Sequence, residues 1–247
     1  MVATLSSNVL RLLAMTGRCM VLPRCAVNVR YYTRRVGPSL QWHTGAMRDS
    51  ILVIACGALA REIDELKKLN GWEHLHLKCI DAHLHHRPAL IADRLREKIR
   101  RYKDEYQHIY VAYADCGTRG EIDRIIEEEG KHIERLPGVH CYQFFAGAQR
   151  FAALSDTEPG TFYVTDFLAQ HFERFVTKPL KLDTHPELHA AYFGNYRRLV
   201  FLSQTDNEEL LVAATEAAEQ LGLEFEHVHC GYGELESSLR EFVQERA

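Results

Sequence analysis

The stretch that decides the fold is residues 51–69, ILVIACGALAREIDELKKL. Its first five residues are apolar and rich in β-branched side chains, which is typical of a strand buried on both faces of a parallel sheet. Cys56 and Gly57 end this run, and residues 58–69 then carry apolar side chains at helical spacing until Gly71 stops the helix. A strand that leads directly into a helix is the building unit of an α/β protein.

The same alternation continues along the chain. Apolar or alternating runs predict strands over residues 74–80, 109–114, 139–145, 199–203 and 225–229. Amphipathic spacing predicts helices over residues 89–105, 121–129, 163–176, 207–221 and 234–245, and the capping box of residues 184–187 predicts the start of another. The sequence therefore predicts a single α/β domain over residues 47–247, with a parallel or mostly parallel sheet covered by helices on both faces.

The composition excludes several classes of protein. Hydrophobic residues make up 46% of the 247 residues and charged residues 26%, which excludes a disordered or low-complexity chain. The sequence contains no run of about 18 apolar residues, so we expect no membrane-spanning helix and no membrane partner. The formal net charge of −4 argues against a protein that coats nucleic acid.

The first 46 residues differ from the rest. Residues 1–46 contain six Arg but no Lys, Asp or Glu, which is typical of a mitochondrial transit peptide. The alternative is an over-long start, because the first apolar strand follows closely after Met47. In either case we expect residues 1–46 to lie outside the fold. We expect a cytoplasmic protein, and a mitochondrial one only if residues 1–46 are a genuine transit peptide.

The cysteines indicate a reducing compartment. The predicted domain contains five widely spaced cysteines and no CxxC motif: Cys56, Cys79, Cys116, Cys141 and Cys230. An odd number of cysteines in a chain that can bury a large core does not predict a disulfide framework. We therefore expect these thiols to be core residues, metal ligands or nucleophiles.

Two of these cysteines precede a glycine at equivalent positions. Cys56-Gly57 and Cys116-Gly117 each follow a predicted strand and come just before a helix, and both units continue into a Glu-Ile-Asp step. The repetition is consistent with duplicated Rossmann-like half-domains. The carboxyl ends of parallel strands share the edge where ligands bind, and a helix N-terminus favours a thiolate. We expect Cys56 and Cys116 to share a site; the alternative is that both are small core residues.

A third thiol can reach the same edge. Cys141 follows His140 after the turn at Pro137-Gly138. Three cysteines can hold Zn(II) and leave a fourth position open, or they can bind three irons of a 4Fe–4S cluster. The spacing of Cys56, Cys116 and Cys141 does not choose between these two centres. His140 is a candidate fourth ligand, and its alternative role is that of a core histidine.

Asp115 precedes Cys116 and gives that strand end a carboxylate. A carboxylate beside a thiolate can act as a base, as a metal ligand or as the hydrogen-bonding partner of a ligand. We therefore predict that Asp115 and Cys116 are the catalytic pair. The alternative is that Asp115 caps the following helix.

Residues 81–88, DAHLHHRP, have an unusual content of histidine. If this segment is extended, His83 and His85 could face the same way as a metal pair. Alternatively, His85 and Arg87 could bind an anionic ligand, or the loop could simply be solvated. The remaining predicted ligand-binding residues are Tyr113, Gly57 and Gly117. A lone Gly-x-Gly at residues 231–233 does not make a dinucleotide site, so no nucleotide cofactor is predicted.

Several blocks of the sequence, taken in order, carry a resemblance. They are ILVIACGALARE, VAYADCGT, PGVHCYQFF, EPGTFYVTDFLAQHF, HPEL, YFGNYRR and QTD. From about Ser50 to the C-terminus the chain resembles the domain of unknown function 1638 family of bacteria and archaea. The resemblance implies that the family's motif cysteines correspond to Cys56, Cys116 and Cys141. It also implies a weak association with corrinoid-dependent methyltransferase systems, and thus with one-carbon or methylamine metabolism, but it supplies no reaction.

The leading hypothesis is a metal-binding protein with Cys56, Cys116 and Cys141 as ligands of Zn or a 4Fe–4S cluster. Thiolate-bound Zn(II) can activate a thiol or water, which suits methyl transfer. The first alternative is a non-catalytic small-molecule-binding or accessory protein that serves a corrinoid or methyltransferase protein. The second alternative is a metal-free thiol enzyme that uses Cys116.

Overall fold

The protein is represented by a computed structural model that describes residues 50–130 and 132–246. The predictions for residues 1–46 fall outside these described residues. The described strands form two sheets, and every strand pair in both sheets is parallel. The prediction of a parallel α/β fold is thus confirmed, with the strands divided between two sheets.

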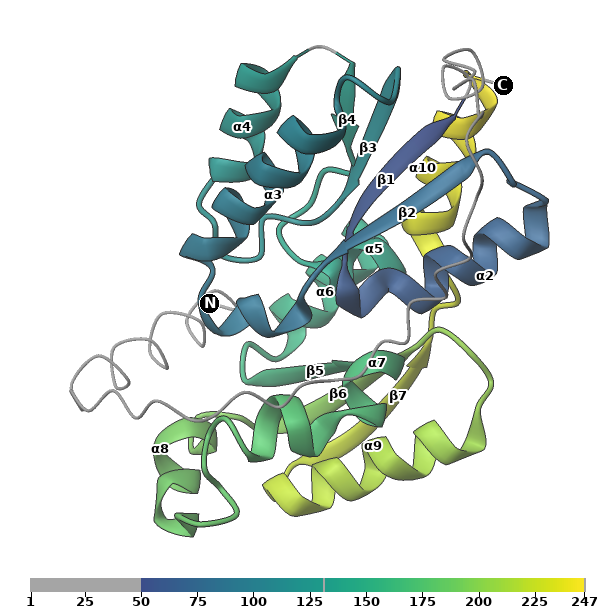
Figure 1. Cartoon of the computed structure of the whole chain (residues 1–247). Helices are drawn as coiled ribbons and strands as arrows, with labels where there is room; N and C mark the ends of the chain where they lie inside the picture. The colour runs from purple at the N-terminus through teal and green to yellow at the C-terminus, as the bar shows by residue number, and fades with distance from the viewer. Residues whose placement is uncertain (1–49, 131, 247) are drawn as a thin grey trace, which may run out of the picture.

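The first sheet has four strands in the order β2-β1-β3-β4 (Figure 1). Their bounds are β1 (Ile51–Cys56), β2 (Leu75–Ile80), β3 (His108–Ala112) and β4 (Ile133–Arg135). The helices of this lobe are α2 (Ala60–Asn70), α3 (Ala89–Tyr102), α4 (Glu121–Glu129) and α10 (Gly233–Gln244). All six residues of β1 are buried, as expected of a strand covered on both faces. We call this sheet and these helices the first lobe.

The helices of the first lobe cover both faces of its sheet. Arg96 of α3 is ion-paired with Glu128 of α4, so these two helices lie side by side. Tyr232, just before α10, hydrogen-bonds Glu65 of α2, which places these two helices together. Right-handed crossovers require this division, because the chain passes from β1 to β2 in one direction and from β2 to β3 and β4 in the other.

The second sheet has three strands in the order β5-β6-β7. They are β5 (Thr161–Thr165), β6 (Arg198–Ser203) and β7 (Glu224–His229), with helices α7 (Asp166–Gln170), α8 (His189–Phe193) and α9 (Glu208–Leu221). We call these elements the second lobe. Helices α5 (Cys141–Ala146) and α6 (Ala148–Thr157) connect the two lobes, and they contribute side chains that pack against the other face of this sheet.

Short helical turns complete the description. Three of them are 3-10 helices: η1 (Gly57–Leu59), η2 (Ala82–His86) and η4 (Pro186–Leu188). The fourth, η3 (Glu173–Thr177), is a π-helix. The π-helix is worth noting because such turns are often found at functional sites.

Capping residues explain why several predicted helix ends are right. The Asn207 side chain accepts hydrogen bonds from the backbone N–H groups of Glu209 and Leu210, which starts α9. Gly71 and Gly222 both adopt the left-handed conformation, with φ of 64° and 65°, and they end α2 and α9.

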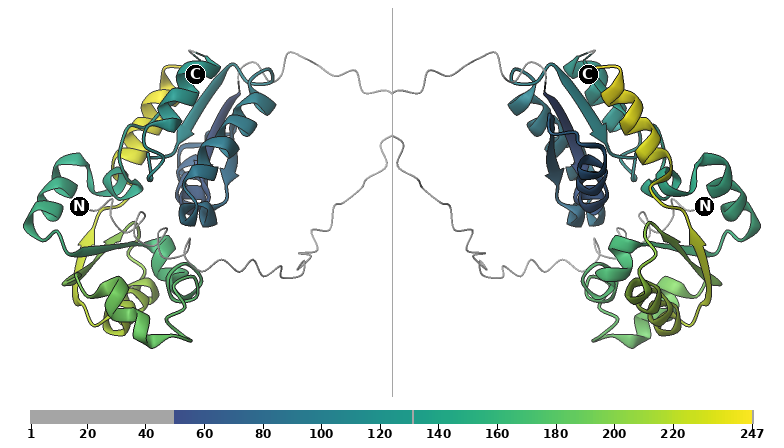
Figure 2. Two further views of the ribbon diagram at one scale, coloured as in Figure 1. Left: turned by 90° about the vertical axis from the view of Figure 1, so that its left-hand side faces the viewer. Right: turned by 90° about the vertical axis from the view of Figure 1, so that its right-hand side faces the viewer.

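Each lobe has its own core, and the C-terminal helix connects them. After β7 of the second lobe, the chain returns to the first lobe, where Leu235 and Leu239 of α10 join its buried core. The second lobe packs around Phe201 and Ala214. Figure 2 shows α10 against the first lobe, with the second lobe below it. The single domain over residues 47–247 stays a prediction.

Two predicted elements are wrong, and one strand was not predicted. The segment predicted as a strand over residues 139–145 forms helix α5 instead. Its aromatic side chains have a high strand propensity, which led to the prediction, but tertiary packing overrides that propensity. The fourth strand is β4, whose three residues are too short to give a periodic signal. Residues 163–176 begin in strand β5, which pairs with β6, before the chain turns into α7.

The capping box of residues 184–187 is also wrong in its detail. The hydroxyl of Thr184 donates to the carbonyl of Lys181, at 3.4 Å, instead of capping a helix. His185 is the N-cap residue of η4, and its side chain makes no capping hydrogen bond. The helical segment does begin here, with Pro186 in its first turn.

Candidate functional site

Three thiols from distant segments of the chain interact at the carboxyl edge of the first sheet. Cys56 is the last residue of β1, Cys116 follows β3, and Cys141 is the first residue of α5. Cys56 is 4% exposed and Cys116 is 7% exposed. The charge of Cys141 raises the pKa of both Cys56 and Cys116, and Cys56 also raises the pKa of Cys116. The structure therefore brings together the three cysteines that the sequence singled out.

The backbone at Cys116 is in an unfavourable conformation for a residue with a side chain. Its φ is 47°, in the left-handed region that glycine occupies without steric cost. Backbone hydrogen bonds hold this loop in place: the N–H of Cys116 donates to Val139 O at 3.0 Å, and that of Asp115 donates to Gly138 O at 2.9 Å. These bonds tie the Cys116 loop to the segment that leads into Cys141. Strain of this kind clusters at functional sites.

Burial dominates the electrostatics of the three thiols. It raises the pKa of Cys56 and of Cys141 to about 12, and it raises that of Cys116 well above the ordinary value. The N–H of Ala58 donates to the Cys56 sulfur at 3.3 Å, which lowers the pKa but does not offset burial. The expectation that helix N-termini make these groups thiolates is thus wrong, and they are neutral thiols at pH 7 without a bound cation.

Tyr113 is the largest buried polar side chain beside the thiols. It is 0% exposed, and its hydroxyl makes no hydrogen bond of ordinary geometry. Burial raises its pKa, and the neighbouring charges of Cys56 and Cys116 raise it further. The ring of His85 stacks on Tyr113 with centroids 5.7 Å apart. A buried hydroxyl without a partner costs about 1–3 kcal/mol, so this site holds an unsatisfied donor.

Glu62, in the first turn of α2, is a site residue that the sequence analysis missed. Glu62 as a whole residue is 2% exposed, and its Oε2 atom has no hydrogen-bond partner among the described residues. Burial raises its pKa to about 7, helped by the charges of Asp166 and Glu65 and opposed by that of Arg61. The charge of Glu62 in turn raises the pKa of Cys141. Glu62 is thus a buried acid near the thiols that titrates close to neutral pH.

Asp166 is a second missed carboxylate, and it belongs to the other lobe. It is 0% exposed at the start of α7 and directly follows strand β5. It accepts hydrogen bonds from the N–H of Gln204 at 2.9 Å and from the hydroxyl of Thr205 at 2.6 Å. The guanidinium of Arg61, from the first lobe, lies 3.6 Å away. The rule that pointed to Asp115, a carboxylate at the end of a strand, would have found Asp166 only if β5 had been predicted as a strand instead of part of a helix.

A cavity of about 260 Å³ lies between the lobes, and we call it the aromatic chamber. Its residues include one thiol, Cys141, and a set of rings from both lobes: His85, His86, Tyr142, Phe162, Phe167, Phe175 and Phe193. Among residues 50–130 and 132–246, no Asp, Glu, Lys or Arg lines this chamber. Burial lowers the pKa of both histidines, so the chamber is lined by uncharged groups at pH 7.

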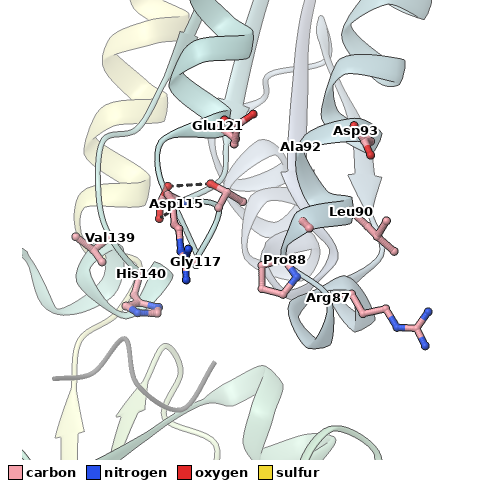
Figure 3. Close-up of a pocket in the computed structure, with 13 residues that line it drawn as sticks. Arg87, Pro88, Leu90, Ala92, Asp93, Asp115, Gly117, Glu121, Val139 and His140 are labelled. Atoms are coloured by element: carbon pink, nitrogen blue, oxygen red, sulfur yellow. Dashed lines mark hydrogen bonds between the residues drawn. The ribbon is translucent and has the colours of Figure 1, made fainter. Parts of the chain in front are cut away.

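A second cavity, of about 960 Å³, opens beside the same edge of the sheet, and we call it the edge pocket (Figure 3). Arg87, Asp115, Gly117 and His140 line it. Burial lowers the pKa of His140, so this ring is neutral at pH 7. The structure thus separates two residues predicted to bind one anion, because Arg87 lines the edge pocket and His85 lines the aromatic chamber.

The carboxylate of Asp115 is occupied by its own loop. It accepts hydrogen bonds from the Thr118 hydroxyl at 2.8 Å and from the N–H groups of Gly120 and Arg119 at 2.7 and 3.1 Å. Burial raises its pKa, but these hydrogen bonds outweigh burial and lower it overall. Asp115 therefore organises the loop that follows Cys116, and a role as base would require it to give up these bonds.

The remaining predicted residues have local structural roles. A side chain at Gly57 would lie 3.2 Å from the carbonyl oxygen of Ile80, so glycine permits the close approach of two loops. Gly117 has φ of 84°, which continues the left-handed turn of Cys116. His83 stacks on Phe175 with ring centroids 4.4 Å apart, while His85 stacks on Tyr113, so the two histidines do not form a metal pair.

Two negative findings apply to the described residues. Within residues 50–130 and 132–246, no group of three or more His, Cys, Asp or Glu side chains is arranged to hold a single metal ion. No helix of that part of the chain is sufficiently long and apolar to cross a membrane.

Comparison with known proteins gives a family and no further relative. Searches of curated proteins and of solved structures found no match. The model of the family described as "Protein of unknown function (DUF1638)" matches residues 79–239, well over half of the chain. This match includes Cys116, Cys141 and Asp166 and agrees with the resemblance seen in the sequence. The chain therefore belongs to the DUF1638 family.

Proposed function

We propose that the protein is a metalloprotein in which the thiolates of Cys56, Cys116 and Cys141 hold a metal centre at the carboxyl edge of the first sheet. The observation that carries this proposal is that thiols from three distant segments meet at one edge of the sheet, where the charge of Cys141 raises the pKa of Cys56 and of Cys116. The left-handed backbone of Cys116 supports it, because a glycine would meet the backbone requirement of that position with less strain.

A bound cation would reverse the protonation of the three thiols. Metal binding displaces thiol protons, and the attraction between thiolate and metal offsets the burial that otherwise keeps these groups neutral. The unpartnered hydroxyl of Tyr113, which interacts with Cys56, could then donate to a thiolate. Glu62, with a pKa of about 7, could accept a proton released near Cys141.

A single Zn(II) ion and a 4Fe–4S cluster both suit three cysteine ligands, and we take the cluster as the case to test first. Sulfur atoms around one Zn(II) lie roughly 3.5–4 Å apart, whereas the cysteine sulfurs of a 4Fe–4S cluster lie roughly 6–7 Å apart. Three cysteines would leave one iron open to an external ligand, and Cys141 also lines the aromatic chamber.

The biological setting is proposed from the family and from the free thiols. All five described cysteines are unpaired, which suits the reducing cytoplasm. The role beside corrinoid methyltransferase systems, in methyl transfer or one-carbon metabolism, is carried over from the resemblance seen in the sequence, since the family itself is described as of unknown function. In this role the metal centre would act on a small molecule, with a corrinoid or methyltransferase protein as partner.

Metal analysis after anaerobic purification and cluster reconstitution tests the proposal. We expect wild-type protein to contain about four iron and four sulfide per chain with a broad absorption near 400 nm. Cys116→Ser should lose most of this iron, and Cys230→Ser, the matched control, should keep it. Stoichiometric zinc without iron would replace the cluster by a Zn(II) site. Wild-type protein that takes up neither metal would refute the metal centre.

A metal-free binding or accessory protein is the second candidate. Two observations favour it. Burial raises the pKa of the thiols, so they are neutral at pH 7, and the described residues that line the chamber include no Asp, Glu, Lys or Arg. Metal-free protein that still binds small molecules, without turnover of methyl donors, would support this alternative.

A further inference from the structure

We propose that the aromatic chamber binds a small, uncharged and mostly apolar molecule with one hydrogen-bonding group, and that this molecule is the substrate of the adjacent thiol site. The second half of this inference rests on the proposed function. The first half, the binding specificity, rests on the chamber alone.

The chamber has the size of a small-molecule site. A dry apolar cavity of about 150 Å³ is enough to bind benzene, and the chamber has about 260 Å³. Its rings support one another: Phe167 and Phe175 meet edge to face with centroids 5.0 Å apart, and Phe162 and Phe193 do so at 5.5 Å. Such contacts hold the walls in place and give an apolar ligand a preformed surface.

The electrostatics of the chamber select an uncharged ligand. Its lining contains no carboxylate, ammonium or guanidinium, and both histidines have pKa values lowered by burial. An ion that entered would lose part of its hydration without gaining an ion pair from the lining. Arg174 lies over the Phe175 ring at 5.5 Å but does not line the chamber, so an anion would lack a positive partner there. A cation would gain only contacts with the aromatic rings, which do not replace a carboxylate partner.

One polar group of the lining is free to orient the ligand. The Nε2 atom of His86 is buried without a hydrogen-bond partner. The neighbouring His85 is already engaged, because its Nδ1 lies 2.9 Å from the carbonyl oxygen of Ala82. A ligand with a single hydroxyl, amide or carbonyl group would satisfy His86 once the ring turns its Nε2 atom, which has almost no accessible surface, toward the chamber.

The position of the chamber connects it to the thiols. Cys141 and Tyr142 line it from α5, and Ala82 and His85 line it from the loop after β2. Thr165, the last residue of β5, lines it from the second lobe. The ligand would therefore contact both lobes and lie against one of the three cysteines.

Three probes of similar size and different charge test the specificity: benzyl alcohol, benzoate and benzylammonium. We expect benzyl alcohol to bind wild-type full-length protein, measured by ligand-observed NMR and calorimetry at pH 7.5. Benzoate and benzylammonium should bind at least tenfold more weakly. Equal affinity for either ion would overturn the proposed specificity, as would failure of benzyl alcohol to bind.

Two variants locate the binding. Leu168→Trp fills the chamber and should abolish binding of benzyl alcohol, whereas Leu211→Trp, the matched control on α9 outside its lining, should not. If Leu168→Trp fails to fold, Val176→Phe fills the chamber from another wall. His86→Phe should remove the preference for benzyl alcohol over toluene. Unchanged binding by a folded filling variant would refute the chamber as the site.

Metal content measured on the same samples separates the two proposals. Benzyl alcohol binding without any metal would refute the metal centre and leave the chamber specificity intact. A metal centre in protein that does not bind benzyl alcohol would refute the chamber specificity and leave the metal centre intact. If both are present, a change in the cluster absorption on adding benzyl alcohol supports contact between them, and an unchanged spectrum overturns the assignment of the chamber as the substrate site.

Discussion

The edge pocket and the aromatic chamber lie beside the same edge of the first sheet but differ in chemistry. The edge pocket is larger and contains charged residues, yet the carboxylate of Asp115 in it is fully hydrogen-bonded. The chamber is smaller and uncharged, yet His86 in its wall lacks a partner. A search for volume or charge selects the first cavity, whereas a search for unsatisfied groups selects the second. If the chamber is the binding site, as proposed, the comparison teaches that an unmet hydrogen bond in a cavity wall is a better guide to a site than volume or charge.

The largest effect is expected for Asp166, next to the chamber. Replacement by Ala leaves the N–H of Gln204 and the hydroxyl of Thr205 without their acceptor in a buried place. We expect Asp166→Ala to lower the free energy of unfolding by about 3–5 kcal/mol, measured in urea. Asp166→Asn, which keeps an acceptor, should cost less; equal loss in both would show that the hydrogen bonds are not the cause.

Glu62 should make stability depend on pH. Its folded-state pKa of about 7 lies above the ordinary value of 4.5, so the folded protein holds the proton more tightly than the unfolded chain. Its contribution is therefore neutral below about pH 4.5 and becomes destabilising as the pH rises to 7, by up to about 3 kcal/mol. Glu62→Gln should match wild type at pH 4 and exceed it at pH 8. An identical pH profile for both proteins would contradict the raised pKa.

Asp115 should have a smaller effect, because its loop faces the edge pocket. Asp115→Ala removes one acceptor from the Thr118 hydroxyl and two backbone N–H groups, of which the latter can reach water. We expect a loss of about 1–2 kcal/mol, the usual value of a helix or loop cap. Thermal unfolding of Asp115→Ala beside Asp166→Ala compares the two cavities directly. A larger loss at Asp115 would reverse the comparison.

The smallest effect is expected at Cys116. In the metal-free form of Cys116→Gly, compared with metal-free wild type, the relief of the left-handed backbone, about 1 kcal/mol, offsets the loss of a buried sulfur. The net change in unfolding free energy should stay below about 1 kcal/mol. Cys56→Gly is the matched control, since Cys56 has an ordinary φ of −60° and should lose about 2 kcal/mol. Similar losses at both positions would show that Cys116 is unstrained.

The sequence predicts the elements whose signal is local. The apolar runs of β1 and β3, and the capped helix α9, are recognisable because their residues alone decide their structure. Strand β4 is too short for such a signal, and α5 becomes a helix only through its packing. The division into two sheets depends on which strands pair. Side-chain periodicity shows that a strand has a buried face, but it does not show which other strand pairs with it.

The candidate site shows the same limit. The cysteines could be predicted to meet because parallel strands end at one edge. Glu62 could not, because an acid in the first turn of an amphipathic helix usually faces solvent. Only three-dimensional packing makes it a buried acid near Asp166 of the second lobe. The walls of the chamber come from both lobes, and the local sequence of neither wall indicates that the two walls face each other.

The return of α10 to the first lobe has a consequence for synthesis. The strands of both sheets are complete before α10 is translated, because β7 ends at His229 and α10 begins at Gly233. Leu235 and Leu239 are core residues of the first lobe, so that core stays incomplete until α10 has left the ribosome. The second lobe can form earlier from contiguous sequence. The first lobe, whose strands are synthesised first, is therefore the second of the two lobes to complete its core, and it does so when α10 packs against it.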